Sequence, residues 1–195
     1  MSGIGSLKRS LTADMRAHGV QKWTPDLIFR RPELFYQQHL RVVEFLQSTR
    51  SPFLRLLRVL VRFRLQRLSV RTGISVPPGV FDEGLSIAHY GSIVVNSKAR
   101  VGKYCRIHSS TNIGVAGGKT PTIGDYVYIG PGAVIYGDVH VGDFSVIGAN
   151  AVVNKNVPSG CTVAGTPARV ISETPSTSIM PEWYTQLGLY GDRNA

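Results

Sequence analysis

Two of the five histidines in this chain of 195 residues occupy places from which they could do chemistry. His89 precedes Val95 by six residues, and His108 follows His89 by nineteen. The imidazole of histidine titrates close to neutral pH, so it can accept the proton of a hydroxyl group in this range. The alternative for His89 is a structural role, in which a hydrogen-bonding partner holds a buried ring.

The positions of these histidines follow from a repeat of six residues. The segment 123–153, IGDYVYIGPGAVIYGDVHVGDFSVIGANAVV, carries an aliphatic residue at every sixth place, and the same spacing continues towards the N-terminus. Neither a helix nor a simple alternating strand has this period. The repeat predicts short strands joined by corners, wound into a solenoid whose aliphatic residues stack inside. The aliphatic residues are Val95, Val101, Ile107, Ile113, Ile123, Ile129, Ile135, Val141, Ile147 and Val153.

The repeat predicts how the two histidines lie relative to each other. Three hexads make one coil of 18 residues, so His89 takes an aliphatic place above residue 107 and beside His108. The two rings should therefore be about one strand spacing, ~4.8 Å, apart along the solenoid axis. Ten residues instead of six separate Ile113 from Ile123, and the segment VAGGKTPT between them predicts a loop.

Charge divides the chain into unequal parts. Residues 1–72 contain 14 Lys and Arg against 4 Asp and Glu, so the net charge of +10 lies entirely there. Helical patterns cover 5–17, 32–48 and 52–70, and Pro77 and Pro78 follow the last of them. We expect a mainly β protein, with a basic α-helical region at 1–72, a solenoid at 73–171 and a tail at 172–195.

The stretch 52–70 is apolar and rich in arginine at once. It fits a helix that lies on an anionic membrane face, or a helix packed on the solenoid or on another subunit. No nucleic-acid reader motif accompanies the basic residues, so we expect no nucleic-acid partner. The tail segment MPEWYTQLGLY is apolar enough to pack onto a neighbour.

Other features restrict where the protein works and how. The sequence shows no secretory signal and no 18 uninterrupted apolar residues, which predicts a cytoplasmic protein, peripheral to the inner membrane face if the basic helix binds lipid. Two cysteines are too few for a disulfide framework. Cys105 fits a small packing residue near a corner or an acyl-carrying nucleophile. His18, His39 and His140 fit surface or packing roles.

The repeat resembles the hexapeptide-repeat acyltransferases, and most closely their serine acetyltransferase branch. The resemblance covers residues 73–171 and rests on GLSIAHYGSIVV, PTIGDYVYIGPGAVIYGD and the closing run IGANAVVNKNVPSGCTVAGTPARVI. It implies a left-handed parallel β-helix, an exception to the usual right-handed crossover. It also implies a homotrimer with acetyl-CoA between neighbouring β-helices. We expect no metal, and we expect the head to pack on the solenoid or to join two trimers.

The resemblance assigns roles to particular residues. His89 becomes the general base that deprotonates an acceptor hydroxyl, a step worth ~10²–10⁴-fold in rate. Lys155 and Arg169 suit the phosphates of the cofactor. Apart from the resemblance, the glycine-rich loop itself suggests that Gly117 and Gly118 supply N–H groups to the oxyanion, with a plain turn as the alternative. The expected acceptor-binding residues are His108, Asn112, Lys119, Thr120 and Tyr90. The expected cofactor-binding residues are Gly117, Gly118, Pro131, Ala149, Asn154, Lys155 and Arg169.

The sequence departs from the serine acetyltransferase pattern where the acceptor should bind. Ala88, Lys119 with Thr120, and Ile74 stand where that branch has an acidic residue, an Arg-His pair and an aspartate. A serine site must pair both a charged ammonium and a charged carboxylate, whereas a neutral sugar needs only hydrogen bonds. The sequence therefore favours a sugar hydroxyl of surface polysaccharide biosynthesis as the acceptor.

L-serine, as in cysteine biosynthesis, stays open as the alternative acceptor. It requires a carboxylate from elsewhere, and Asp26 or Glu33 of the head or of a neighbouring subunit could supply it. Asp82 or Glu83 could replace the carboxylate that orients His89. The remaining alternative is a noncatalytic or metal-binding β-helix trimer, which would need three convergent histidines for each zinc ion.

Overall fold

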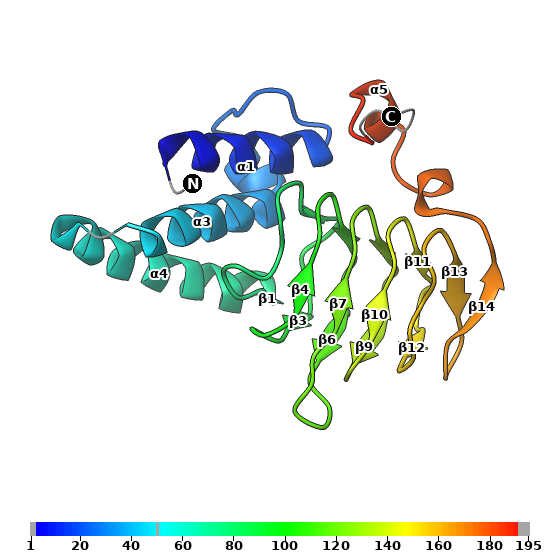
Figure 1. The fold of residues 1–195 in the computed structure, drawn as a ribbon. Coiled ribbons are helices and arrows are strands. Elements are labelled where there is room, and N and C mark those ends of the chain that lie inside the picture. Colours follow the sequence, from blue (N-terminus) through cyan, green and yellow to red (C-terminus); the bar gives the residue numbers. More distant parts are fainter. Residues whose placement is uncertain (1–2, 50, 191–195) are drawn as a thin grey trace.

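The computed structural model describes residues 3–49 and 51–190, without the side chains of residues 52 and 53. A helical head precedes a solenoid of short strands, and the chain then folds back towards the head (Figure 1). The helices of the head agree to within two residues with the expected stretches, and a short α2 was not foreseen. They are α1 (Ile4–Ala17), α2 (Leu27–Arg30), α3 (Pro32–Gln47) and α4 (Pro52–Thr72).

The solenoid is a parallel β-helix with three sheets, and this confirms the predicted architecture. Its strands are β1 (Ile74–Ser75), β2 (Ser86–Ile87), β3 (Ile93–Val95), β4 (Arg100–Val101), β5 (Arg106–Ile107), β6 (Asn112–Gly114), β7 (Thr122–Ile123), β8 (Tyr128–Ile129), β9 (Val134–Tyr136), β10 (His140–Val141), β11 (Val146–Ile147), β12 (Val152–Val153), β13 (Thr162–Ala164) and β14 (Arg169–Ser172). Sheet A contains β1, β3, β6, β9 and β12, sheet B contains β4, β7 and β10, and sheet C contains β2, β5, β8, β11, β13 and β14. Each coil passes from sheet C to sheet A to sheet B. The solenoid therefore has three edges, and we name each edge by the two sheets that it joins: the C/A, A/B and B/C corners.

Aliphatic side chains of the hexads form the core, as predicted. Ile107, Ile129 and Ile147 stack in sheet C and are fully buried. One prediction of register is wrong, because the residue that pairs with Ile107 is Ile87 and not His89. That coil is 20 residues long, and the two additional residues enlarge the corner between β2 and β3. His89 therefore projects from this corner and is exposed.

The predicted loop is present and interrupts the repeat between β6 and β7. It projects from the body of the solenoid (Figure 1). A two-way backbone pairing between Ala116 and Lys119 closes the loop, and Gly117 and Gly118 at its tip have positive φ angles. The chain then re-enters the hexad frame at Ile123, whose side chain is buried.

A buried ion pair joins the head to the first coil of the solenoid. Arg41 of α3 donates hydrogen bonds of 2.8 and 3.1 Å to the carboxylate of Asp14 in α1, and both side chains are 3% exposed. The same guanidinium donates to the carbonyl oxygens of Phe81 and Asp82 and to Glu44. Burial lowers the pKa of Arg41, but the charges of Asp14 and Glu44 and the hydrogen bonds to both carboxylates together outweigh this effect and raise it above its ordinary value.

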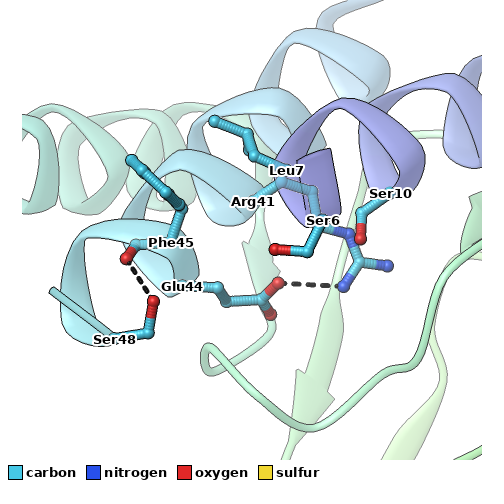
Figure 2. Close-up of a pocket in the computed structure, with 7 residues that line it drawn as sticks. All are labelled: Ser6, Leu7, Ser10, Arg41, Glu44, Phe45 and Ser48. Carbon is cyan, nitrogen blue, oxygen red and sulfur yellow. Dashed lines mark hydrogen bonds and ion pairs between the residues drawn. The ribbon is translucent and has the colours of Figure 1, made fainter. Parts of the chain in front are cut away.

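A hollow of about 270 Å³ lies beside this ion pair, between α1 and α3. Figure 2 shows Arg41 paired with Glu44 at its wall, with Ser6 and Ser10 of α1 facing them. Because the guanidinium is already engaged by Asp14, Glu44 and two carbonyl groups, the hollow offers little unpaired charge to a ligand. We assign it to the junction between head and solenoid.

Hydrogen bonds of two buried side chains add to this junction. His18 contacts Gln37 at 2.7 Å, and Gln37 donates to the carbonyl oxygen of Leu85 in the solenoid. Burial lowers the pKa of His18 to about 4, although the contact with Gln37 opposes the shift. The ring is therefore neutral at pH 7 and has a packing role, as expected.

The C-terminal tail turns back onto the head of its own chain. After the 3-10 turn η1 (Ser176–Ser178), helix α5 (Trp183–Gln186) lies near α1 (Figure 1). The indole of Trp183 donates to the carbonyl oxygen of Ala17 at 3.1 Å, and Tyr184 is buried with Ala17. The apolar tail thus contacts the first helix of its own chain, and it also packs against Tyr104 and Tyr128 of the solenoid.

Replacement of Arg41 by alanine should destabilise the protein by about 3–5 kcal/mol, because it leaves the Asp14 carboxylate buried without its partner. Arg9 provides the matched control, since it pairs with Glu83 at 3.1 Å but is 68% exposed. Arg9→Ala should cost less than about 1 kcal/mol. Denaturant unfolding of both variants measures the difference, and equal losses would contradict the role given to Arg41.

Candidate active site

The end of α4 holds the corner from which His89 projects. Gly91 donates its N–H to the carbonyl oxygen of Thr72 at 2.8 Å, and Ile93 donates to that of Gly73 at 3.0 Å. Gly73 has a φ of 73°, and a Cβ atom there would lie 2.9 Å from the carbonyl group of Gly91. Only glycine allows this close approach without strain. The head thus fixes the backbone next to His89.

The structure brings His89 and His108 together, as the sequence predicted. Their ring centroids are 6.3 Å apart, with an angle of 60° between the ring planes. His108 follows β5 on the adjacent coil, so both histidines lie at the C/A corner. The ring of Tyr128 lies 5.0 Å from that of His108 on the other side. Tyr128 was not among the expected residues, although its register with Arg106 follows from the hexad count carried through the loop.

His108 is neutral and has an unused polar atom. Burial, together with the charges of Arg106 and His89, lowers the pKa of His108 from 6.5 to about 4. Its Nε2 atom is buried, and within the described residues it has no hydrogen-bond partner. An unsatisfied buried polar atom costs about 1–3 kcal/mol. A bound hydroxyl or carbonyl group would satisfy it, which makes the C/A corner a candidate ligand site.

A carboxylate of the head lies within electrostatic reach of His89. Glu33 stands in the first turn of α3, and its side chain is 5% exposed. Burial raises the pKa of Glu33, while its backbone hydrogen bond, Arg31 and the charge of His89 act in the opposite direction. Arg31 is 3.7 Å away, so its ion pair with Glu33 is a long one.

The other carboxylates considered from the sequence are engaged elsewhere. Asp26 is exposed and pairs with Arg30 at 3.0 Å. Glu83 pairs with Arg9 and Lys103, and its carbonyl oxygen accepts from Tyr104 at the B/C corner. The proposal that Asp82 or Glu83 orients His89 is therefore wrong, because the coil carries both residues to a different corner.

The expected loop residues lie at the A/B corner, away from His89. Lys119 forms an exposed ion pair with Asp138, and Thr120 donates to the carbonyl oxygen of Lys98 at 3.1 Å. Asn154 and Lys155 follow β12 and occupy the same corner farther along the solenoid. All four expected side chains lie at the surface, and Thr120 is half-buried.

The remaining expected residues are distributed around the C/A corner and sheet A. Tyr90 is 60% exposed beside His89, and Pro131 and Ala149 are exposed at later turns of the same corner. Asn112 is exposed on sheet A, and Arg169 is exposed on β14 at the end of the solenoid. Sheet A separates the two corners by about five residues of extended chain, or ~16 Å. One chain therefore does not unite the two groups of expected residues.

Other reactive groups play no part in this arrangement. Cys105 is fully buried, and burial raises the pKa of its thiol, so it fits the packing role better than that of a nucleophile. In the part of the chain that the structure describes, no group of three or more His, Cys, Asp or Glu could hold a metal ion. The described helices also include none that is long and apolar enough to span a bilayer.

Comparison with known proteins adds to this geometry. The family model described as bacterial transferase hexapeptide (six repeats) matches residues 120–155. A serine acetyltransferase of Helicobacter pylori is 34% identical over 174 residues, 86% of this chain and 95% of that protein. A serine acetyltransferase of Synechococcus elongatus is 36% identical over 136 residues, 67% of this chain but 53% of that protein. The chain thus spans about half the length of the second relative.

Solved structures give the same picture. Serine acetyltransferase from Brucella abortus aligns with a TM-score of 0.72 and 28% identity, covering 87% of this chain and 70% of that chain. A serine acetyltransferase in complex with CoA aligns with a TM-score of 0.71 and 25% identity, covering 86% of this chain and 71% of that chain. The expected left-handed parallel β-helix is confirmed by these neighbours.

The preference for a sugar hydroxyl as the acceptor is wrong. The relatives at 34 and 36% identity and the structural neighbours are consistently serine acetyltransferases, not enzymes of polysaccharide O-acetylation. The preference rested on charges missing at positions 88 and 120. A carboxylate from the head, Asp26 or Glu33, was considered only for the alternative acceptor, and in the folded chain Glu33 lies within electrostatic reach of His89.

Proposed function

Since the chain belongs to the serine acetyltransferase family, we propose that it transfers an acetyl group from acetyl-CoA to the hydroxyl group of L-serine. The observation that carries this proposal is the group at the C/A corner: exposed His89, neutral His108 at a ring distance of 6.3 Å, and the Glu33 carboxylate. This combination offers a base, a hydrogen-bonding ring and an anionic partner for an ammonium group.

His89 is the general base in the proposed reaction. It takes the proton of the serine hydroxyl as the oxygen attacks the thioester carbonyl of acetyl-CoA. The C–S bond then breaks, and the imidazolium returns the proton to the departing thiolate. His108 is neutral at pH 7, so it can hydrogen-bond to the reacting oxygen without competing with His89 for the proton.

Glu33 binds the ammonium group of serine in this proposal. Its carboxylate is nearly buried, so its attraction to a cation is less screened than on the open surface. The nearby charge of Arg31 is held at 3.7 Å, which leaves the carboxylate able to accept a second donor. The ionised form of Glu33 also favours the imidazolium that His89 becomes during the reaction.

The site is completed by a second copy of the chain in a homotrimer. The A/B corner of the second copy brings Lys119 to the serine carboxylate, and Lys119 gives up its ion pair with Asp138. The same corner brings Asn154 and Lys155 to the cofactor. Pro131 and Ala149 of the C/A corner line the other side of the acetyl-CoA channel, with Gly117 and Gly118 near the oxyanion and Arg169 near the phosphates. The existence of a related structure in complex with CoA supports this cofactor.

Replacement of His89 by alanine should lower kcat for L-serine by at least about 100-fold, with the KM for acetyl-CoA nearly unchanged, because the imidazole acts in the transition state. Steady-state assays that follow release of the CoA thiol measure both constants. The proposed function fails if the folded wild-type protein shows no acetyl-CoA-dependent turnover of L-serine. The role of His89 fails if the variant keeps wild-type turnover.

Glu33→Gln should raise the KM for L-serine by about tenfold or more, since the buried site then lacks the charge that pairs the ammonium. The KM for acetyl-CoA should not change. Asp26→Asn is the matched control, because Asp26 is also a carboxylate of the head but is exposed and paired with Arg30. A KM for serine that moves equally in both variants would assign Glu33 a merely structural part.

Mixed trimers should regain activity when the two variants damage different corners. Co-expression of His89→Ala chains with Lys155→Glu chains should restore about a quarter of the sites. In random assembly about half of the C/A corners and about half of the A/B corners are intact, so both corners of a site are intact in about a quarter of cases. His89→Ala mixed with Ala149→Glu is the control, since both changes damage the same corner. Activity of the first mixture no higher than that of the control would refute sites shared between subunits.

A further inference from the structure

Helix α4 presents an apolar stripe to the outside of the protein. The members of the stripe are between 61 and 78% exposed, although they are large hydrophobic residues. They recur at the spacing of three, four and seven residues that places side chains on one face of a helix. We call this set the α4 stripe, and it comprises Leu56, Val59, Leu60, Phe63 and Val70.

The opposite face of α4 is held by the rest of the head. Leu65 is buried, and Val61 and Leu68 pack against the same core. The helix also contacts α3 along its length and β1 at its end. The α4 stripe therefore cannot rotate inward, and its exposure follows from the fixed position of the helix.

Arginines surround the α4 stripe on both sides. The helix contains six of them and no acidic residue. Arg55 and Arg62 border one edge, and Arg64 and Arg71 border the other, by the geometry of a helix with 3.6 residues per turn. Among the described residues, no ion pair includes an arginine of α4. Their positive charge is thus available to an anionic partner.

We propose that the α4 stripe docks on a lipid bilayer that contains anionic headgroups. Apolar side chains flanked by cationic ones are the arrangement of a helix that lies in the plane of a membrane interface. Each arginine is attracted to an anionic bilayer surface, and its fork of donors suits the headgroup phosphate. Docking of this kind does not require a helix that crosses the bilayer, and the described helices include none that could cross it.

Charge disfavours a second copy of α4 as the occupant of the stripe. Two such helices packed along their stripes would bring their arginines together, and neither helix has a carboxylate to separate them. Like charges that face each other across helices destabilise the pairing. An anionic surface removes this repulsion, whereas a second α4 adds to it.

An apolar hollow lies between α4 and the candidate active site, on the side of the helix where Leu68 packs against the core. Phe29 of α2 is 87% exposed, and with Ile28 it lines a hollow of about 340 Å³ that Leu68 and Arg71 of α4 also line. Tyr90, the neighbour of His89, lines the same hollow. The hollow touches the edge of the α4 stripe at Arg71 but contains no member of the stripe.

Vesicle flotation of the full chain tests this proposal. The protein should float with vesicles of phosphatidylcholine and ~30% phosphatidylglycerol, and its partition coefficient should be about tenfold higher than with phosphatidylcholine alone. The coefficient should fall about tenfold as salt rises from ~0.05 to ~0.5 M, because salt screens the arginines. Flotation that is absent at low salt, or unaffected by lipid charge, overturns the proposal.

A matched pair of variants locates the contact. Leu60→Glu places a carboxylate in the α4 stripe, and Ile171→Glu does the same at the far end of the solenoid, where Ile171 is 65% exposed against 61% for Leu60. Only Leu60→Glu should abolish flotation, and unfolding curves should show both variants folded. If both variants float like the wild type, the stripe is not the contact. If Leu60→Glu instead dissociates an assembly of the protein that does not float, the stripe joins copies and the proposal is overturned.

Discussion

The pairing of Arg41 with Asp14 is the interaction on which the candidate site depends. Glu33 and Arg41 stand on the same helix, α3, and Arg41 binds the carbonyl groups of the first coil directly. A buried charge tolerates little displacement, because any loss of its partners leaves it desolvated. The ion pair therefore sets the distance of α3 from the solenoid, and with it the reach of Glu33 to His89.

The hexad repeat imposes a second constraint, which determines where parts of a site can lie. Buried aliphatic residues fill the interior, so functional side chains can project only from the faces and corners. The enlarged corner after β2 frees His89 from the core, and the loop after β6 displaces Lys119 outward at another corner. A solenoid of this width has no deep pocket of its own, which is why two corners from separate copies are a natural way to enclose a substrate.

The sequence predicted what the period alone determines. The stacked core residues, the loop between Ile113 and Ile123 and the nearness of His89 to His108 all follow from counting in sixes. The exact register of His89 did not, because a coil of 20 residues is visible only once Ile87 is seen to pair with Ile107. Packing of the head on the solenoid was one of the expected arrangements, but its individual contacts were beyond prediction, since helical patterning reports which face of a helix is buried but not what covers it.

The acceptor shows why the missing contacts mattered most. Ala88 and Thr120 stand where the serine acetyltransferase pattern has charged residues. On that basis the sequence alone favoured a neutral acceptor. The net charge a ligand meets is nevertheless a property of the folded site, and α3 brings the carboxylate of Glu33, 56 residues before His89 in the sequence, within electrostatic reach of that histidine. Loss of a charged residue at one position therefore does not argue against a charged substrate until the neighbouring elements are placed. Here the neighbouring element is the head. Its attachment to the first coil places the Glu33 carboxylate near His89, whereas the repeat itself has no such carboxylate there.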